Sequence, residues 1–287
     1  MKRTTAGALA GIASLALAAT LMPGAASAGP ASGRSFGGSG NLAIGLTGSG
    51  KLVAFHLRLP EVPRTIGKIS GLTGDTALVG VDYRVQDRKL YGVGNAGGVY
   101  TISTWSAKAT KVSQLTVPLL GAKFGVDFNP AADRLRVVSD TGQNLRHDVN
   151  PGGATVIDSH LTYPPAITPA AGISAAAYTN NDLDPTTATT LFDLDTTLDQ
   201  VALQSPANSG QLAATGKLGV DAGPDAGFDI FSDTRHGTTQ SVRGWATLGV
   251  NGKYALYSVS LLTGKAHIEG RFPRHAQVTD LAVKLDH

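Results

Sequence analysis

Three aspartates recur at one position of a repeated strand pattern in this sequence of 287 residues. Asp82, Asp127 and Asp229 stand within Val-Asp-Tyr, Val-Asp-Phe and Phe-Asp-Ile. Asp is disfavoured inside strands, so its recurrence needs a physical cause. Carboxylates gathered at a central channel would hold a basic ligand or a cation, and calcium suits oxygen ligands from several repeats. Alternatively, each carboxylate accepts hydrogen bonds from turn N–H groups of its own or the next blade.

Other polar side chains would enlarge this candidate site and suit it to a small polar ligand. Three arginines surround the polar turn Ser139–Asn144, namely Arg134, Arg136 and Arg146. The guanidinium fork suits carboxylate, phosphate or sugar hydroxyls, and pairing with Asp127, Asp133 or Asp140 is an equally natural use. The full predicted ligand-binding set is Asp82, Asp127, Asn129, Arg136, Asn144, Arg146, Tyr178, Asn180 and Asp229.

Two further polar segments are weaker candidates for a binding site. The run Asn180–Asp184, with Asp193, Asp195 and Asp199, is acidic enough to ligate calcium, but it lacks the Gly and Glu positions of a helix–loop–helix calcium site. Such acidic turns are also common on soluble β proteins. The turn Gln204–Gly210 would shape the rim of a pocket or serve as an ordinary loop.

The sequence predicts no catalytic residue. It has no Gly-x-Ser-x-Gly elbow, no HExxH motif and no His-x-His spacing. The segment Gly45–Leu52 resembles a phosphate-binding loop up to Lys51, but Leu52 stands where Ser or Thr must bind magnesium, so we expect a hairpin turn. A catalytic pair of carboxylates assembled in space stays open.

The elements that must position these residues are short strands. The stretch Lys123–Leu161 contains four strand-type pieces, Phe124–Phe128, Arg134–Ser139, Asn144–Val149 and Ala154–Ile157, joined by turns rich in Asn, Asp, Pro and Gly. Similar sets of four begin at Leu78, Ile173 and Gly227, with matching first strands about 45 to 53 residues apart. Helical periodicity is nearly absent, so the fold class is all-β.

The two ends of the chain complete the repeat pattern. The C-terminal piece Val278–Val283 matches a lone first strand, while Asn41–Leu46, Leu52–Leu57 and Thr65–Ile69 match three strands without a first one. Joined, they make a composite blade, which predicts a five-bladed β-propeller over residues 41–287. A sixth blade stays open if Asn180–Thr190 hides another element. A β-sandwich also fits the strand spacing, but it does not explain the missing first strand at the N-terminus.

The N-terminus predicts export. Lys2 and Arg3 precede an apolar run that ends before Ala26-Ser-Ala28, which is typical of a signal peptide (1–28) cut after Ala28. A flexible Gly/Ser-rich leader follows at 29–40. Without Lys2 and Arg3 the net charge falls from +3 to +1, which argues little for nucleic acid. We expect a secreted monomer with no membrane span in its mature form.

Several blocks of the sequence resemble a family of secreted bacterial proteins known as a domain of unknown function, number 4394. The blocks are Gly125–Pro130, Asp133–Ser139, Gly142–Arg146, Ala177–Asn181, Thr190–Asp195, Gln204–Gly210 and Gly227–Ile230. The resemblance covers about residues 40 to 285 and implies an exported, cysteine-poor β-repeat protein. The chain has no cysteine, which excludes disulfides and thiolate chemistry. The resemblance implies no activity and no catalytic residues.

Three functional hypotheses follow from these patterns. The leading one is a non-catalytic binding module for a small polar ligand, a glycan or a cell-envelope partner. The alternative is a calcium-dependent hydrolase of the lactonase type, with Asp82, Asp127, Asp229, Asn129 or Asn180 on a central cation. The third is a structural or adhesion protein of the cell surface. Calcium is the one cofactor that the acidic positions would suit.

Overall fold

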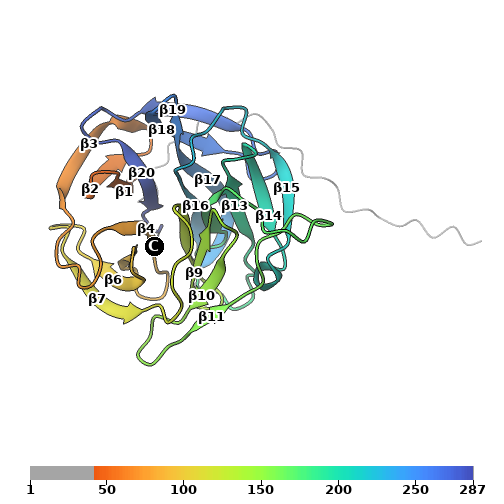
Figure 1. Cartoon of the computed structure of the whole chain (residues 1–287). Helices are drawn as coiled ribbons and strands as arrows, with labels where there is room; N and C mark the ends of the chain where they lie inside the picture. Colours follow the sequence, from red (N-terminus) through yellow and green to blue (C-terminus); the bar gives the residue numbers. More distant parts are fainter. Residues whose placement is uncertain (1–41, 287) are drawn as a thin grey trace, which may run out of the picture. The chain divides into compact units, whose positions relative to one another are not determined.

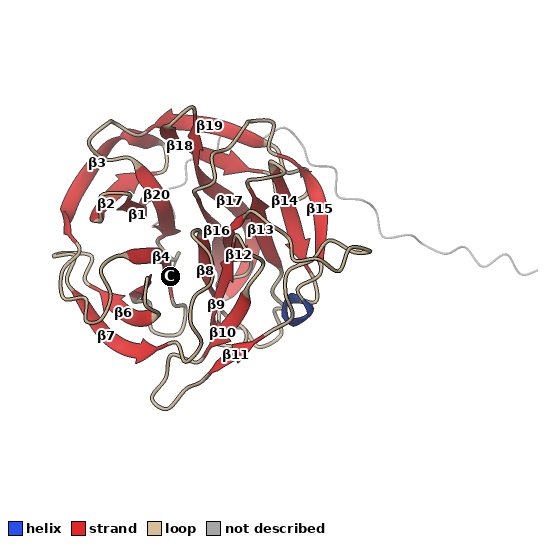
Figure 2. Cartoon of the chain, in the orientation of Figure 1, coloured by secondary structure: helices blue, strands red, loops and turns tan. Residues whose placement is uncertain are grey.

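Residues Leu42–Asp286 are described by the computed structural model, and they form five four-stranded antiparallel sheets arranged as the blades of a β-propeller (Figure 1). The predicted signal peptide and leader, together with Asn41 and His287, lie outside the described residues. The described residues contain no helix of the length and hydropathy needed to cross a bilayer. Figure 2 shows that strands make up almost all of the regular structure, beside one short 3-10 helix, η2 (Ala207–Ser209).

The blades are numbered from the N-terminus, and within each blade the strands follow one another from the centre outward. Blade 1 contains β20 (Val278–Val283), β1 (Leu42–Thr47), β2 (Lys51–His56) and β3 (Leu59–Lys68). Blade 2 contains β4 (Leu78–Tyr83), β5 (Leu90–Gly94), β6 (Gly98–Ile102) and β7 (Ala109–Gln114). Blade 3 contains β8 (Phe124–Asn129), β9 (Arg134–Ser139), β10 (Asn144–His147) and β11 (Thr155–Ile157). Blade 4 contains β12 (Ile173–Tyr178), β13 (Leu191–Asp195), β14 (Gln200–Gln204) and β15 (Leu212–Lys217). Blade 5 contains β16 (Ala226–Arg235), β17 (Thr238–Val250), β18 (Lys253–Val259) and β19 (Ala266–Arg271).

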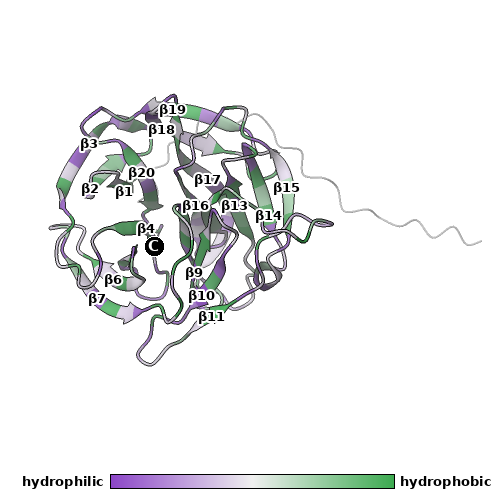
Figure 3. Cartoon of the chain, viewed as in Figure 1, coloured by the Kyte–Doolittle hydropathy of each residue, from purple (hydrophilic) through white to green (hydrophobic). Residues whose placement is uncertain are grey.

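Burial explains the order of the strands within each blade. Inner strands such as β12, with the sequence Ile-Ser-Ala-Ala-Ala-Tyr, are buried throughout, as expected for strands covered on both faces. Outer strands such as β7 and β11 are mostly exposed, and β7 is also more polar; Figure 3 shows hydrophilic stretches on β3, on β7 and in the loops. Among the described residues, five apolar clusters lie between neighbouring blades, so that each boundary has its own core.

The ring closes as the sequence predicts. Strand β20 pairs antiparallel with β1, with Ala43 opposite Val283 and Gly45 opposite Leu281. One blade is therefore built from both ends of the described chain, which removes two sheet edges that would otherwise be exposed. Residues 180–190 contain no strand, so residues 42–286 form five blades and no sixth. The segment 45–52 is a hairpin turn between β1 and β2, as expected.

Two predicted strand boundaries were wrong. The outer strand of blade 1 begins at Leu59 instead of Thr65, because its first half pairs with the end of β2 around bulges. The set predicted to begin at Gly227 begins at Ala226, and its first two strands, β16 and β17, extend into a long hairpin. The polar tip of this hairpin has no core-facing pattern, so nothing local in its sequence marks it as strand.

Close packing at the centre explains a glycine two residues before each repeated aspartate. Gly80, Gly125 and Gly227 occupy this position. A Cβ on Gly125 would lie 2.5 Å from the backbone nitrogen of Ala176, closer than real Cβ contacts. The inner strands of neighbouring blades thus approach so closely that only glycine fits.

Substitution of Gly125 by Ala tests this packing. Because the added methyl group meets the backbone of β12 and not a flexible side chain, we expect the free energy of unfolding to fall by about 1–3 kcal/mol or more. Chemical denaturation measures the change. The matched control is Gly48→Ala, whose Cβ meets nothing closer than a methyl of Thr279 at 3.5 Å. Equal stability of the two variants would contradict the argument.

Candidate functional site

The three repeated aspartates meet at the centre of the propeller. Asp82, Asp127 and Asp229 come from the inner strands β4, β8 and β16, and each offers a carboxylate oxygen within 4.8 Å of the others. All three side chains are buried. The structure thus brings these three positions together at the ring axis, as the sequence predicts.

Each aspartate also links its blade to the next one. Oδ2 of Asp82 accepts the backbone N–H of Phe128 at 2.8 Å. Oδ1 of Asp127 accepts the backbone N–H of Tyr178 at 3.2 Å. The donors lie on the facing edges of the neighbouring inner strands, where no sheet partner is available. The carboxylates therefore satisfy backbone groups that would otherwise be buried without a partner.

The same bonds continue through the closing blade. Oδ2 of Asp229 accepts the N–H of Val283 at 2.5 Å, and Oδ2 of Asp280 accepts the N–H of Val81 at 2.8 Å. Asp280 is outside the predicted set, although its place in Val-Thr-Asp-Leu is the same mid-strand signal. Between blades 4 and 5 the pattern stops, because β12 carries Ala177 where other repeats carry Asp.

Burial and crowding raise the pKa of these carboxyl groups. Burial, and then the charge of Asp229, raises the pKa of Asp82 well above its ordinary value. Burial, and then the charge of Asp82, does the same to the pKa of Asp127. Burial raises the pKa of Asp229 to about 6 and that of Asp280 well above its ordinary value. Near neutral pH, a proton or a cation must offset this concentrated negative charge. An all-oxygen set of this kind suits a hard ion such as calcium.

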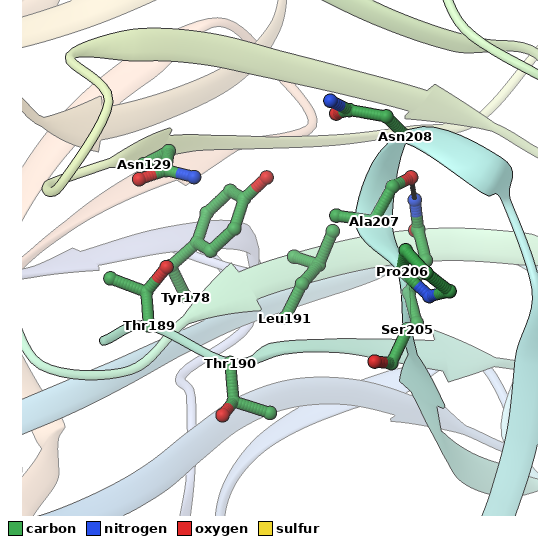
Figure 4. A pocket seen from close by; sticks show the side chains of 10 residues that line it. Asn129, Tyr178, Thr189, Thr190, Leu191, Ser205, Pro206, Ala207 and Asn208 are labelled. Carbon is green, nitrogen blue, oxygen red and sulfur yellow. Dashed lines mark hydrogen bonds between the residues drawn. The ribbon is translucent and has the colours of Figure 1, made fainter.

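A separate pocket of about 350 Å³ lies where blade 4 meets blade 3 (Figure 4). Asn129 and Tyr178, at the ends of the inner strands β8 and β12, form one part of its wall. The segments Thr189–Leu191 and Gln204–Asn208 form the rest. The turn at Gln204–Asn208, which the sequence marks as a potential rim, therefore contributes half of the lining residues.

The groups that line this pocket are polar but uncharged. They include hydroxyls, side-chain amides and one phenol, together with the apolar surface of Leu191 and Pro206. Oε1 of Gln204 is buried and has no hydrogen-bond partner among the described residues. A buried acceptor without a donor is costly, so it is ready to accept a hydrogen bond from a ligand or a water molecule.

Arg136 lies behind the pocket and fixes two of its walls. Its Nε donates to the hydroxyl of Tyr178 at 3.2 Å, and its Nη2 donates to Oδ1 of Asn208 at 2.7 Å. Its Nη1 donates to Asn144 at 2.7 Å and to Asp158 at 2.6 Å. Burial lowers the pKa of Arg136, but the interactions with Tyr178 and Asp158 outweigh it and the pKa is raised.

The side chain of Arg146, the other arginine of the predicted ligand-binding set, also pairs with a residue of the protein itself. Nε of Arg146 donates to both oxygens of Asp158, at 3.0 and 3.1 Å. Arg134 pairs with Asp148 at 3.2 Å. The aspartates proposed as partners from sequence were therefore not the ones used. Asp158 was missed because it follows the short strand β11 in a segment without any motif.

The amide of Asn144 donates to two backbone carbonyls, those of Ser159 and Ala207. Asn144 thus holds the pocket turn from beneath and does not line the pocket. Asn180, with φ of 64°, donates its side-chain amide to the carbonyl of Ala188 and shapes its own loop.

The acidic run after β12 secures the long hairpin of blade 5. Oδ2 of Asp182 accepts the N–H and the hydroxyl of Thr239 at 2.9 and 2.6 Å. Oδ2 of Asp184 accepts the hydroxyl of Thr238 at 2.9 Å. Among the described residues, only the three axial aspartates group as a candidate metal site, and the acidic run does not.

Fold and site together define a five-bladed β-propeller with buried axial carboxylates and an uncharged pocket at one blade boundary. The chain belongs to the family described as Domain of unknown function (DUF4394), whose model matches residues 51–282. No curated protein is similar to it in sequence.

Solved structures resemble the fold at low identity. An auxiliary nutrient binding protein from Bacteroides ovatus is 12% identical with a TM-score of 0.40, over 72% of this chain and 55% of that one. A protein of unknown function from Bacteroides thetaiotaomicron is 13% identical with a TM-score of 0.46, over 85% and 64%. The chain thus spans little more than half of the first of these. With TM-scores below 0.5, these likenesses carry no argument about this chain.

The raised pKa values predict how one substitution changes stability with pH. A raised folded-state pKa means that the folded protein binds more protons than the unfolded chain, so the stability from the carboxyl group is complete below pH 4. It is lost as the pH rises through the folded-state pKa, which is about 6 for Asp229 and lies well above its ordinary value for Asp127. In Asp127→Asn the amide oxygen still accepts the N–H of Tyr178, but the buried charge is gone. We expect this variant to melt at a higher temperature than the parent at pH 8 and at the same temperature near pH 4.

The exposed Asp221 supplies the matched control, because Asp221→Asn removes a charge without desolvation. Melting curves in chelator from pH 4 to 8 are the measurement. A melting temperature for Asp127→Asn that stays below the parent's at pH 8 in chelator would contradict the argument.

Proposed function

We propose that the protein is a secreted, non-catalytic binding module that takes a neutral, polyhydroxylated ligand such as a glycan in the pocket where blade 4 meets blade 3. The observation that carries the proposal is the lining of that pocket, which combines many hydrogen-bonding groups with no Asp, Glu, His, Lys or Arg. Ligand sites commonly join apolar surface to a few well-placed polar groups that fix orientation.

The chemistry of the lining matches a sugar more closely than an ion. Hydroxyls of Thr189, Thr190 and Ser205 both donate and accept, as sugar hydroxyls do. Oε1 of Gln204 adds an acceptor without a donor of its own among the described residues. A charged ligand would leave its charge uncompensated here, which is costly when water is displaced.

The pocket is preorganised by the network behind it. Arg136 holds Tyr178 and Asn208, which belong to opposite parts of the wall. Because these side chains are already fixed, binding need not order them, and less affinity is lost to conformational entropy. This supports a binding role, whereas acid–base catalysis would need an ionisable group near neutral pH within the lining.

The axial aspartates support a second candidate function, a calcium-dependent hydrolase. Three carboxylate oxygens within 4.8 Å of one another would hold a hard cation at the ring centre. Elemental analysis, melting with and without chelator, and a panel of lactones and esters decide between the candidates. About one calcium per chain together with turnover would favour the hydrolase over the binding module.

A double substitution tests the proposed pocket. A neutral-oligosaccharide array identifies a ligand, and titration calorimetry then compares the parent with Thr189→Val/Thr190→Val. Each lost hydrogen bond contributes about 1 kcal/mol, so we expect about 5- to 30-fold weaker binding at an unchanged melting temperature. Thr65→Val, an exposed hydroxyl on β3, is the matched control. Unchanged affinity in the double variant, or an array without any hit, would refute the site.

Export has its own test. We expect the protein made in a secreting bacterial host to appear in the medium with Gly29 as its first residue. Mass spectrometry of the intact protein reads the N-terminus directly. Replacement of Ala26 and Ala28 by Arg should block cleavage, because the cleavage site requires small residues. Protein that keeps residues 1–28 inside the cell would show the export proposal to be wrong.

A further inference from the structure

A second and larger cavity, of about 640 Å³, lies on blade 2 and has a different chemistry. Its wall includes Tyr83 at the end of β4, the turn before β5, and the turn that joins β6 to β7. Lys284, which follows the closing strand β20, completes it. The cavity therefore depends on ring closure, since it joins blade 2 to the C-terminal segment.

Four cationic side chains converge on this cavity. Arg88, Lys89, Lys108 and Lys284 all line it, and all are exposed, while no Asp or Glu is among the lining residues. The ion pair beside them is loose, with Nζ of Lys89 at 3.7 Å from Oδ2 of Asp87. Cations from separate segments around one concave surface create a positive potential that attracts anions.

An exposed tryptophan stands beside these cations. Trp105 is 87% exposed, whereas Trp245, the second of the two tryptophans, is only 6% exposed. Hydrogen bonds stabilise the turn that carries Trp105, because Oγ of Ser103 accepts the N–H groups of Trp105 and Ser106, each at 3.3 Å. A large aromatic ring held in water by a fixed turn is typical of a binding surface.

Five serine and threonine residues also line the cavity, namely Thr101, Ser103, Thr104, Ser106 and Thr110. We propose that this cavity is a second binding site, for an anionic saccharide whose sugar ring lies against Trp105 and whose acidic group pairs with the lysines and Arg88. The proposal does not rest on the neutral pocket at blade 4.

The lining of this cavity suits a saccharide better than a nucleic acid. Single-stranded nucleic acid is typically held by several aromatic side chains along a groove, each stacking on one base. This cavity offers one exposed aromatic ring and five serine or threonine residues, which match one hydroxyl-rich ring better than a row of bases.

Fluorescence of Trp105 gives a direct test on the unmodified protein. Trp245 is buried, so acrylamide quenching reports mainly on Trp105. Trigalacturonate supplies a carboxylated probe, mannose 6-phosphate a phosphorylated one, and maltotriose a neutral one. We expect at least one acidic probe to protect Trp105 from quenching, more weakly as salt is raised, while maltotriose does not. The tighter of the two acidic probes identifies the preferred acidic group.

Variants locate the site by calorimetry with the better acidic probe. Trp105→Ala and the double variant Lys108→Gln/Lys284→Gln should each weaken binding at least tenfold. Leu262→Ala, which is also an exposed apolar side chain, and Lys253→Gln, an exposed lysine elsewhere, should bind as the parent does.

The proposal is overturned if neither acidic probe protects Trp105 at millimolar concentration, or if maltotriose protects it equally. It is also overturned if a short oligothymidylate binds more tightly than both sugars. Binding that survives both site variants excludes this cavity.

Discussion

The propeller depends on buried aspartates that accept a backbone N–H from the inner strand of the next blade. An inner strand pairs with its own blade along one edge only, so the N–H groups on its other edge need acceptors in a region without water. Asp82, Asp127, Asp229 and Asp280 supply them. Because the bond requires the strands to lie close together, the glycine two positions before Asp82, Asp127 and Asp229 follows from the same constraint. The recurring Gly-x-Asp sequence thus determines how closely the inner strands of neighbouring blades approach one another around the ring.

The same constraint creates the electrostatic character of the axis. The four carboxyl groups of the buried ring all have raised pKa values, with burial as the largest cause for each of them. Blade 4 is the exception, since Ala177 cannot accept the N–H of Ile230, which donates to Oδ1 of Asp229 at 2.6 Å instead. The inner strand of blade 4 carries Ala177 at the Asp position, and the hydroxyl of the next residue, Tyr178, is held by Arg136. The neutral pocket lies at this blade, the one whose inner strand lacks the recurring Asp.

Local sequence predicted the fold better than the site. Five blades and their closure follow from short alternating strands and turn residues, which act within about ten residues. The convergence of the axial aspartates follows from repetition, because equivalent positions of a ring must meet at its axis. The partners of Arg136 could not be predicted, since Asp158 and Asn208 are 22 and 72 residues away and belong to turns without periodicity. The extension of β16 and β17 was likewise hidden, because Asp182 and Asp184 stabilise its tip from another blade.

The two cavities show how one repeat supports two chemistries. In an antiparallel blade, the end of the inner strand and the turn from the third to the fourth strand lie at the same end of the sheet. Each cavity uses both features: Tyr83 and the turn around Trp105 in blade 2, Tyr178 and the turn at Gln204–Asn208 in blade 4. Corresponding turns therefore carry cations and an exposed ring in one blade and neutral amides and hydroxyls in the other. Because the core holds the ring without these turns, their side chains are free to differ, and the polar character of the cavities on this common face differs from blade to blade.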